Sequence, residues 1–211
     1  MVCTSKHMKI KAVLFDFDGT LVNSVEQVYL GSRNVLIESG VQVPTFPEFC
    51  EEYEAPYATY FKKRGVTASN SDILRWYFDV ARADEQPFFD DVCDVLQQLR
   101  EQGILLGIIS AHYKGKIQKR LKESNLAHHM QVVVGRAHTK VRPIQQFCHK
   151  SNISFEDACY VGDFASDVRD ARKAGVVSIG ITRGNETRDM LLRNGADYCI
   201  DDLYGLMSLF K

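Results

Sequence analysis

Short runs of apolar residues recur along the chain, and helix-like segments separate most of them. The runs have the length of buried strands and lie at residues 10–15, 104–109, 131–134, 158–161, 176–181 and 197–200. Between them, apolar positions recur every three or four residues at 90–102, 143–150 and 167–174. Alternation of strands and helices with short connections predicts a parallel sheet covered by helices on both faces, which is the doubly wound α/β class.

One interval breaks this alternation. Between the first and the second predicted strand, apolar residues follow helical spacing throughout, as in the stripe at 25–36 that Gly40 closes. A segment of this length is too long for a simple connection between neighbouring strands. We therefore expect a Rossmann-like core at residues 1–21 and 88–211, interrupted by an inserted helical cap at residues 22–87.

Composition and charge narrow the class of protein. The chain has 211 residues, of which 45% are hydrophobic and 25% charged, and its formal net charge of −1 lacks the basic excess typical of nucleic-acid-binding proteins. No apolar run approaches the roughly 18 residues of a membrane span, and the first residues lack the apolar segment of a signal peptide. The six cysteines show no CxxC or disulfide-like spacing. We therefore expect a cytoplasmic protein that binds neither nucleic acid nor membrane. For the oligomeric state we expect a monomer or weak homodimer.

Acidic residues stand where predicted strands end. Asp16 and Asp18 follow the first strand, and Asp163 and Asp167 follow the fourth. Buried strands normally avoid unpaired acids, whereas ligands of doubly wound sheets bind at the carboxyl ends of the strands. A carboxylate such as Asp16 can attack phosphorus and form an aspartyl-phosphate. Asp18 can protonate the leaving oxygen and then deprotonate the attacking water, while Gly19 lets the backbone turn.

The converging carboxylates also point to a bound cation. They would repel one another without one, and an oxygen-only ligand set in phosphate chemistry favours Mg²⁺. Ser110, at the end of the second strand, and Lys140, after the third, are expected to hold phosphate oxygens. Singly, these features are also compatible with an ordinary loop, a helix N-cap or a solvated surface charge. Their occurrence in order at strand ends favours one site.

The same motifs resemble those of haloacid dehalogenase superfamily hydrolases, most closely the phosphoglycolate phosphatase-like branch with a small helical cap. FDFDGTLVNS resembles the first motif, and LLGIIS, which ends in Ser110, resembles the second. KVRP with Lys140 and YVGDFASD with Asp163 and Asp167 resemble the third and fourth, and TRGNETRDMLLRNGADYCIDD resembles the closing segment. Dehalogenase members lack the acid at the position of Asp18, so this chain resembles the phosphoryl-transferring majority.

The resemblance implies a Mg²⁺-dependent phosphatase that acts on a small phosphorylated metabolite. Asp16 would be the nucleophile and a metal ligand, and Asp18 the acid/base and a metal ligand through its backbone carbonyl. Asp163 would bind the metal, with Asp167 binding or supporting it. The implied phosphate contacts are Gly19, Thr20, Ser110, Ala111 and Lys140.

Two departures from the family pattern affect this site. The family often has Asn after the serine of the second motif, whereas Ala111 and His112 follow Ser110 here, so His112 or backbone amides would have to supply that phosphate contact. In the third motif Val141 and Arg142 fill the middle positions. Arg142 is then either a contact for an anionic substrate or, as is more common, a surface arginine.

The predicted cap should close over the phosphate site. This requires hinges near residues 21–24 and 85–88 and a polar patch facing the cleft. The segment 53–66 resembles the part of related caps that reaches toward the substrate. Its basic residues Lys62, Lys63 and Arg64 are either contacts for a carboxylate or second phosphate, or a solvated helix end, where cations are favoured in any case.

Two other functions use the same phospho-aspartate chemistry. A mutase of the β-phosphoglucomutase type would return the phosphoryl group to a sugar, although the Gly162-Asp163 pair slightly favours a phosphatase. A non-catalytic receiver-like module also pairs an aspartate with Ser/Thr and Lys around Mg²⁺. Such modules are shorter, lack a helical insertion and have no use for Asp18. Phosphate-ester hydrolysis is therefore the main prediction.

Overall fold

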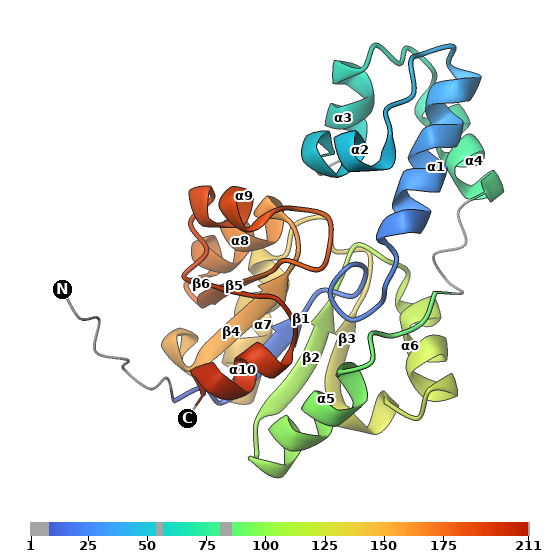
Figure 1. Ribbon diagram of the computed structural model, residues 1–211. Coiled ribbons are helices and arrows are strands. Elements are labelled where there is room, and N and C mark those ends of the chain that lie inside the picture. The colour runs from blue at the N-terminus through green and yellow to red at the C-terminus, as the bar shows by residue number, and fades with distance from the viewer. Residues whose placement is uncertain (1–8, 54–56, 81–85, 211) are drawn as a thin grey trace.

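A six-stranded parallel sheet forms the centre of the computed structural model, which describes residues 9–53, 57–80 and 86–210 (Figure 1). The strand order is β3-β2-β1-β4-β5-β6. The bounds are β1 Ala12–Phe15, β2 Leu105–Ile109, β3 Met130–Val134, β4 Ala158–Gly162, β5 Val177–Ile181 and β6 Tyr198–Ile200. Each predicted strand is present with ends shifted by at most two residues. The predicted doubly wound α/β class is confirmed.

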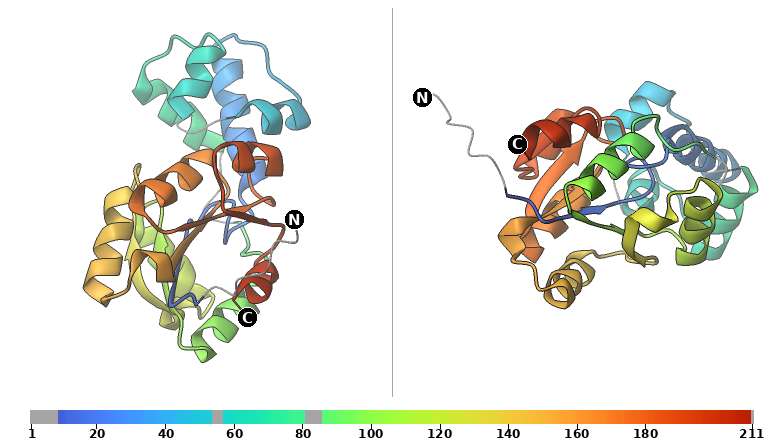
Figure 2. Two further views of the ribbon diagram at one scale, coloured as in Figure 1. Left: turned by 90° about the vertical axis from the view of Figure 1, so that its left-hand side faces the viewer. Right: turned by 90° about the horizontal axis from the view of Figure 1, so that it is seen from below.

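Helices cover both faces of the sheet (Figure 2). One face carries α5 (Val92–Glu101), α6 (Lys114–Glu123) and α10 (Tyr204–Leu209), and the other carries α7 (Val141–Ser151), α8 (Ala165–Ala174) and α9 (Arg188–Arg193). Short 3₁₀ turns at Ala127–His129 and Phe155–Asp157 precede β3 and β4. Among the described residues, no helix has the length and apolar character of a bilayer span.

The central strand β1 explains this layering. Val13 and Phe15 belong to the hydrophobic cluster that includes α5, whereas Ala12 and Leu14 belong to the cluster that includes α7 and α8. All four side chains have no exposed surface. A continuous apolar run is therefore needed here, because successive residues of a strand point to opposite faces and both faces are covered.

Four helices stand apart from the sheet, at the end where β1 finishes (Figure 1). They are α1 (Val25–Glu38), α2 (Phe46–Glu52), α3 (Tyr57–Lys63) and α4 (Asn70–Val80), and we call them the helical group. A separate hydrophobic cluster holds the group together, with Val35, Leu36, Phe49, Tyr60 and Phe61 among its buried members. The boundaries between the core and the cap, expected at 21/22 and 87/88, remain a prediction.

The two connections to the helical group run side by side. Val22 forms an antiparallel bridge with Phe88, and the Asn23 N–H donates to the Pro87 carbonyl at 3.0 Å. The entry and exit of the helical group therefore meet at one point of the core. Glu85, at the start of the second predicted hinge, lies outside the described residues.

Candidate active site

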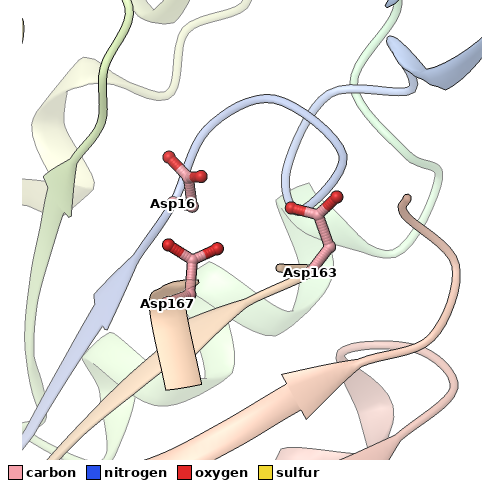
Figure 3. A group of neighbouring side chains, drawn as sticks. All are labelled: Asp16, Asp163 and Asp167. Carbon is pink, nitrogen blue, oxygen red and sulfur yellow. The ribbon is translucent and has the colours of Figure 1, made fainter. Parts of the chain in front are cut away.

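Three carboxylates converge at the carboxyl ends of β1 and β4 (Figure 3). Asp16 directly follows β1, Asp163 directly follows β4, and Asp167 lies in the first turn of α8. The strands are paired with Phe15 opposite Val161, so the residues that come next emerge side by side. Each carboxylate offers an oxygen within 4.8 Å of the others, and all three residues are buried. Three of the four predicted acids at strand ends, Asp16, Asp163 and Asp167, thus form one cluster.

Two glycines make room for the buried Asp163 carboxylate. A Cβ on Gly19 would lie 2.2 Å from Asp163 Oδ2, and one on Gly184 would lie 2.2 Å from Asp163 Cβ. Gly19 also has a φ of +71°, a conformation that favours glycine. Larger residues at either position would push the carboxylate out of the cluster.

Hydrogen bonds orient Asp163 within this space. Its Oδ2 accepts from the backbone N–H of Asn185 at 2.8 Å and from Asn185 Nδ2 at 2.7 Å, and its Oδ1 accepts from the Thr20 hydroxyl at 3.3 Å. Neighbouring Glu186 accepts from the Ala165 N–H, at the start of α8, at 2.6 Å. Asn185 and Glu186 are buried, and the sequence interpretation missed both. Their position after β5, at another strand end, was the available signal.

Lys140 is the cation of the cluster. Its Nζ lies 2.8 Å from Asp16 Oδ2 and also pairs with Asp167, and the residue is only 7% exposed. Burial by itself would lower the pKa of this ammonium, but Asp16 and Asp167 outweigh that effect and raise the pKa. Lys140 therefore stays charged. Its predicted contact with phosphate stays a prediction.

One ammonium does not balance three buried carboxylates. Burial, followed by the charges of Asp167 and Asp16, raises the pKa of Asp163 well above its ordinary value. Burial also raises the pKa of Asp167, partly opposed by Lys140. Both shifts reflect acids that are buried close together, and the three side chains offer an ion only hard oxygen donors. This donor set fits Mg²⁺, which prefers oxygen ligands.

Asp18 turns its side chain to a different partner. Its Oδ2 lies 2.9 Å from Nδ1 of His112, while its Oδ1 is buried and has no hydrogen-bond partner in the described part of the chain. The backbone N–H of His112 donates to Ser110 Oγ at 3.2 Å. His112, considered above as a substitute phosphate ligand, thus presents Nδ1 to Asp18. The Asp18 side chain is not part of the carboxylate cluster, so its predicted metal contact would come from the backbone carbonyl.

The other predicted phosphate ligands lie around the same strand ends. Ser110 follows β2 and is buried, and Ala111 next to it is exposed. The Gly19 N–H bonds within its own loop, and the Thr20 hydroxyl is used by Asp163. Their assignment as phosphate ligands stays a prediction.

Three basic residues of the helical group lie at the C-terminal end of α3, namely Lys62, Lys63 and Arg64. Arg64 pairs with Glu52 and lies over the ring of Tyr60, 5.8 Å from its centroid. Lys62 and Lys63 are exposed in the last turn of α3. Outside the helical group, Arg142 is likewise exposed, at the second position of α7. The hypothesis that these cations read an anionic leaving group stays untested.

Two tyrosines in the hydrophobic cluster of the helical group, Tyr53 and Tyr77, have phenol pKa values that burial raises. The Tyr53 ring packs against Phe164, 5.9 Å between centroids. Burial, then Tyr60 and Asp163, raises the pKa of Tyr53. Burial, then Tyr53 and Asp18, raises the pKa of Tyr77. The ring contact with Phe164 places Tyr53 beside the start of α8, which carries Asp167. The sequence interpretation placed Tyr53 in the segment 53–66, expected to reach toward the substrate, but named neither tyrosine as a site residue.

The sheet is doubly wound, one acid follows β1, a second acid stands two residues on, and a Lys–Asp cluster lies beside them. This combination is typical of a class of phosphoryl-transfer hydrolases. The family model described as haloacid dehalogenase-like hydrolase matches residues 13–181. The chain therefore belongs to this family. The predicted enzyme class, a phosphoric monoester hydrolase of the haloacid dehalogenase superfamily, is confirmed.

Relatives match over nearly the whole chain. A glyceraldehyde 3-phosphate phosphatase of Methanopyrus kandleri is 29% identical over 89% of this chain and 90% of its own length. A phosphoglycolate phosphatase of Synechococcus elongatus is 25% identical over 91% and 93%. A haloacid dehalogenase-like hydrolase of Streptococcus pneumoniae has the same fold, with a TM-score of 0.79, 24% identity and coverage of 96% and 99%.

Proposed function

We propose that the protein is a Mg²⁺-dependent phosphatase that hydrolyses a small phosphorylated metabolite through an aspartyl-phosphate on Asp16. The observation that carries this proposal is the buried cluster of three carboxylates and Lys140 at the end of β1, with the separate carboxyl of Asp18 two residues further on. The names of the relatives that act on phosphoglycolate and glyceraldehyde 3-phosphate support a small substrate.

The proposed reaction has two steps, and Asp16 and Asp18 take part in both. In the first, an Asp16 oxygen bonds to phosphorus while the ester P–O bond breaks, and Asp18 gives its proton to the leaving oxygen. In the second, water attacks phosphorus and gives a proton to Asp18 as the Asp16–phosphorus bond breaks. Inorganic phosphate leaves, and both residues return to their starting states. Lys140, charged and fixed beside Asp16, stabilises charge on the phosphoryl oxygens.

Asp16, Asp163 and Asp167 would hold the Mg²⁺ ion, together with the backbone carbonyl of Asp18. When bound, the ion would neutralise the carboxylates and polarise the phosphoryl group. Asn185 supports this role because its two hydrogen bonds fix the orientation of Asp163.

The helical group would act as the cap. Its paired connections allow it to move as a unit, and the contact between Tyr53 and Phe164 joins it to the start of α8, beside Asp167. Closure over the strand ends would exclude water from the first step and bring helical-group side chains to the leaving group.

Metal-free protein is expected to lose stability as the pH rises from about 4 toward neutrality. Asp163 and Asp167 have raised pKa values in the folded state, so the folded state binds more protons than the unfolded state in this window. Saturating Mg²⁺ should raise the melting temperature at pH 7.5. At a Mg²⁺ concentration a hundredfold above its Kd, the free energy of unfolding should rise by about 2.7 kcal/mol. Thermal unfolding at pH 5.5 and 7.5, in EDTA and in Mg²⁺, measures both effects.

The control for this prediction is Asp163→Asn, which removes one of the competing charges. Its melting temperature in EDTA should fall less between pH 5.5 and 7.5 than that of the wild type. An equal fall of the melting temperature in both proteins would contradict the raised pKa of Asp163. No stabilisation by Mg²⁺ would contradict the assigned metal site.

The proposed function is tested by phosphate release. Wild-type protein should hydrolyse p-nitrophenyl phosphate in Mg²⁺ and lose that activity in EDTA, and a panel of phosphorylated metabolites should then identify better substrates. Hexose phosphates in the panel are analysed for isomerised product as well as for free phosphate. Isomerisation without phosphate release would overturn the phosphatase in favour of the mutase, and inactivity toward all esters would overturn the catalytic proposal.

A further inference from the structure

We infer that His112 is a positioning residue for Asp18: its imidazole anchors Oδ2 and so fixes the orientation of the carboxyl that transfers the proton. The inference rests on the proposed phosphatase reaction and adds to it a residue that the family motifs quoted above do not include. It starts from the unequal environments of the two Asp18 oxygens.

The two oxygens of Asp18 differ in their partners. Oδ2 lies 2.9 Å from His112 Nδ1, a hydrogen-bond distance. Oδ1 has almost no exposed surface and no partner in the described part of the chain. A buried carboxylate oxygen without a hydrogen bond is costly, and such groups call for an explanation such as a catalytic role. The Asp18 side chain as a whole is 27% exposed, and its hydrogen bond with His112 is the contact that fixes its orientation.

His112 is itself held from several sides. Its backbone N–H donates to Ser110 Oγ at 3.2 Å, and its carbonyl accepts from the Arg136 N–H at 2.8 Å. Its ring packs against Phe17, 5.8 Å between centroids. Gly135 permits the close approach of the two loops, since a Cβ there would lie 2.6 Å from the His112 carbonyl oxygen. The loop after β2 is thus built to present this imidazole rigidly.

The same hydrogen bond serves both steps of the reaction. An imidazole Nδ1–H can donate to Asp18 Oδ2 both in the carboxylate and in the carboxylic acid. In the first step the Asp18 carboxyl gives its proton to the leaving oxygen, and in the second it takes a proton from water. The anchored oxygen therefore keeps its partner throughout, and the carboxyl does not rotate between turns of the cycle. Fixed orientation of an acid/base contributes directly to its efficiency.

Three substitutions separate the hydrogen bond from packing. His112→Asn keeps an amide nitrogen close to the position of Nδ1 but removes most of the ring. His112→Gln places its amide nitrogen near the position of Nε2 instead. His112→Phe keeps an aromatic ring against Phe17 and has no donor.

The measurement is kcat/KM on two substrates with different leaving groups, in saturating Mg²⁺. An alkyl phosphate has a poor leaving group and needs the acid, whereas p-nitrophenyl phosphate needs it much less. His112→Phe and His112→Gln should lower kcat/KM for the alkyl phosphate by about 100-fold and for p-nitrophenyl phosphate by less than about fivefold. His112→Asn should stay within about fivefold of the wild type on both. Inhibition by inorganic phosphate should be the same in all four proteins.

Other results would overturn the inference. If His112→Phe were active and His112→Asn were slow, the His112 ring would contribute through packing only. Equal losses on both substrates would indicate a general structural role, and weaker inhibition by phosphate would make His112 a phosphate ligand. These outcomes all require an active wild type. A wild type that hydrolyses no phosphate ester would instead overturn the proposed function.

Discussion

Asp16→Asn is expected to abolish phosphate-ester hydrolysis while the protein stays folded. The amide is nearly the same size as the carboxylate but is a poor nucleophile, so no aspartyl-phosphate forms and the rate should fall by at least about 10⁴-fold. Initial rates with p-nitrophenyl phosphate measure the loss. Acid-quenched protein examined by mass spectrometry during turnover should carry one phosphoryl group in the wild type and none in the variant.

The matched control for this variant is Asp189→Asn. Asp189 lies in α9 with a side chain that is 79% exposed, and its substitution should leave the rate unchanged. A phosphorylated Asp16→Asn protein, or one with a rate near that of the wild type, would mean that another group is the nucleophile.

Lys140→Met is expected to cause the largest loss of stability and a large loss of activity. The variant leaves Asp16 and Asp167 buried without their cation, and breaking a buried ion pair from one side costs about 3–5 kcal/mol. The loss should be smaller at pH 5.5 than at pH 7.5, because carboxylates without the ammonium take up protons more readily. Denaturant unfolding in EDTA measures the free energy of unfolding, and phosphate release in Mg²⁺ measures the activity.

The matched control for the lysine variant is Lys173→Met on the exposed surface of α8. It removes the same charge without leaving a buried carboxylate and should change the free energy of unfolding by less than about 0.5 kcal/mol. If the two lysine variants were equally stable, Lys140 would not be balancing the charge of the cluster. Activity retained by Lys140→Met would argue against its assigned contact with phosphate.

The sequence interpretation was accurate where a strand or helix has a clear hydrophobic pattern of its own. Strands appeared where they were expected because a strand covered on both faces must be apolar at every position, as in β1. Helix α6 was not predicted, because only Ile117 and Leu121 of its ten residues are buried and the rest of the pattern is polar. Pro143 was expected in the first turn of its helix, and the helix does begin nearby, two residues earlier at Val141.

The apolar strands, the acids at their ends and the family could be read from the amino-acid sequence, since each depends on residues close together in the chain. The tertiary structure alone decided which distant side chains meet. The sheet order places β1 between β2 and β4, and this brings Asp16 to Asp163 and brings the loop after β2 to Asp18. Nothing in the local sequence pairs Asn185 with Asp163 or His112 with Asp18. Those hydrogen bonds exist because strands far apart in sequence end side by side.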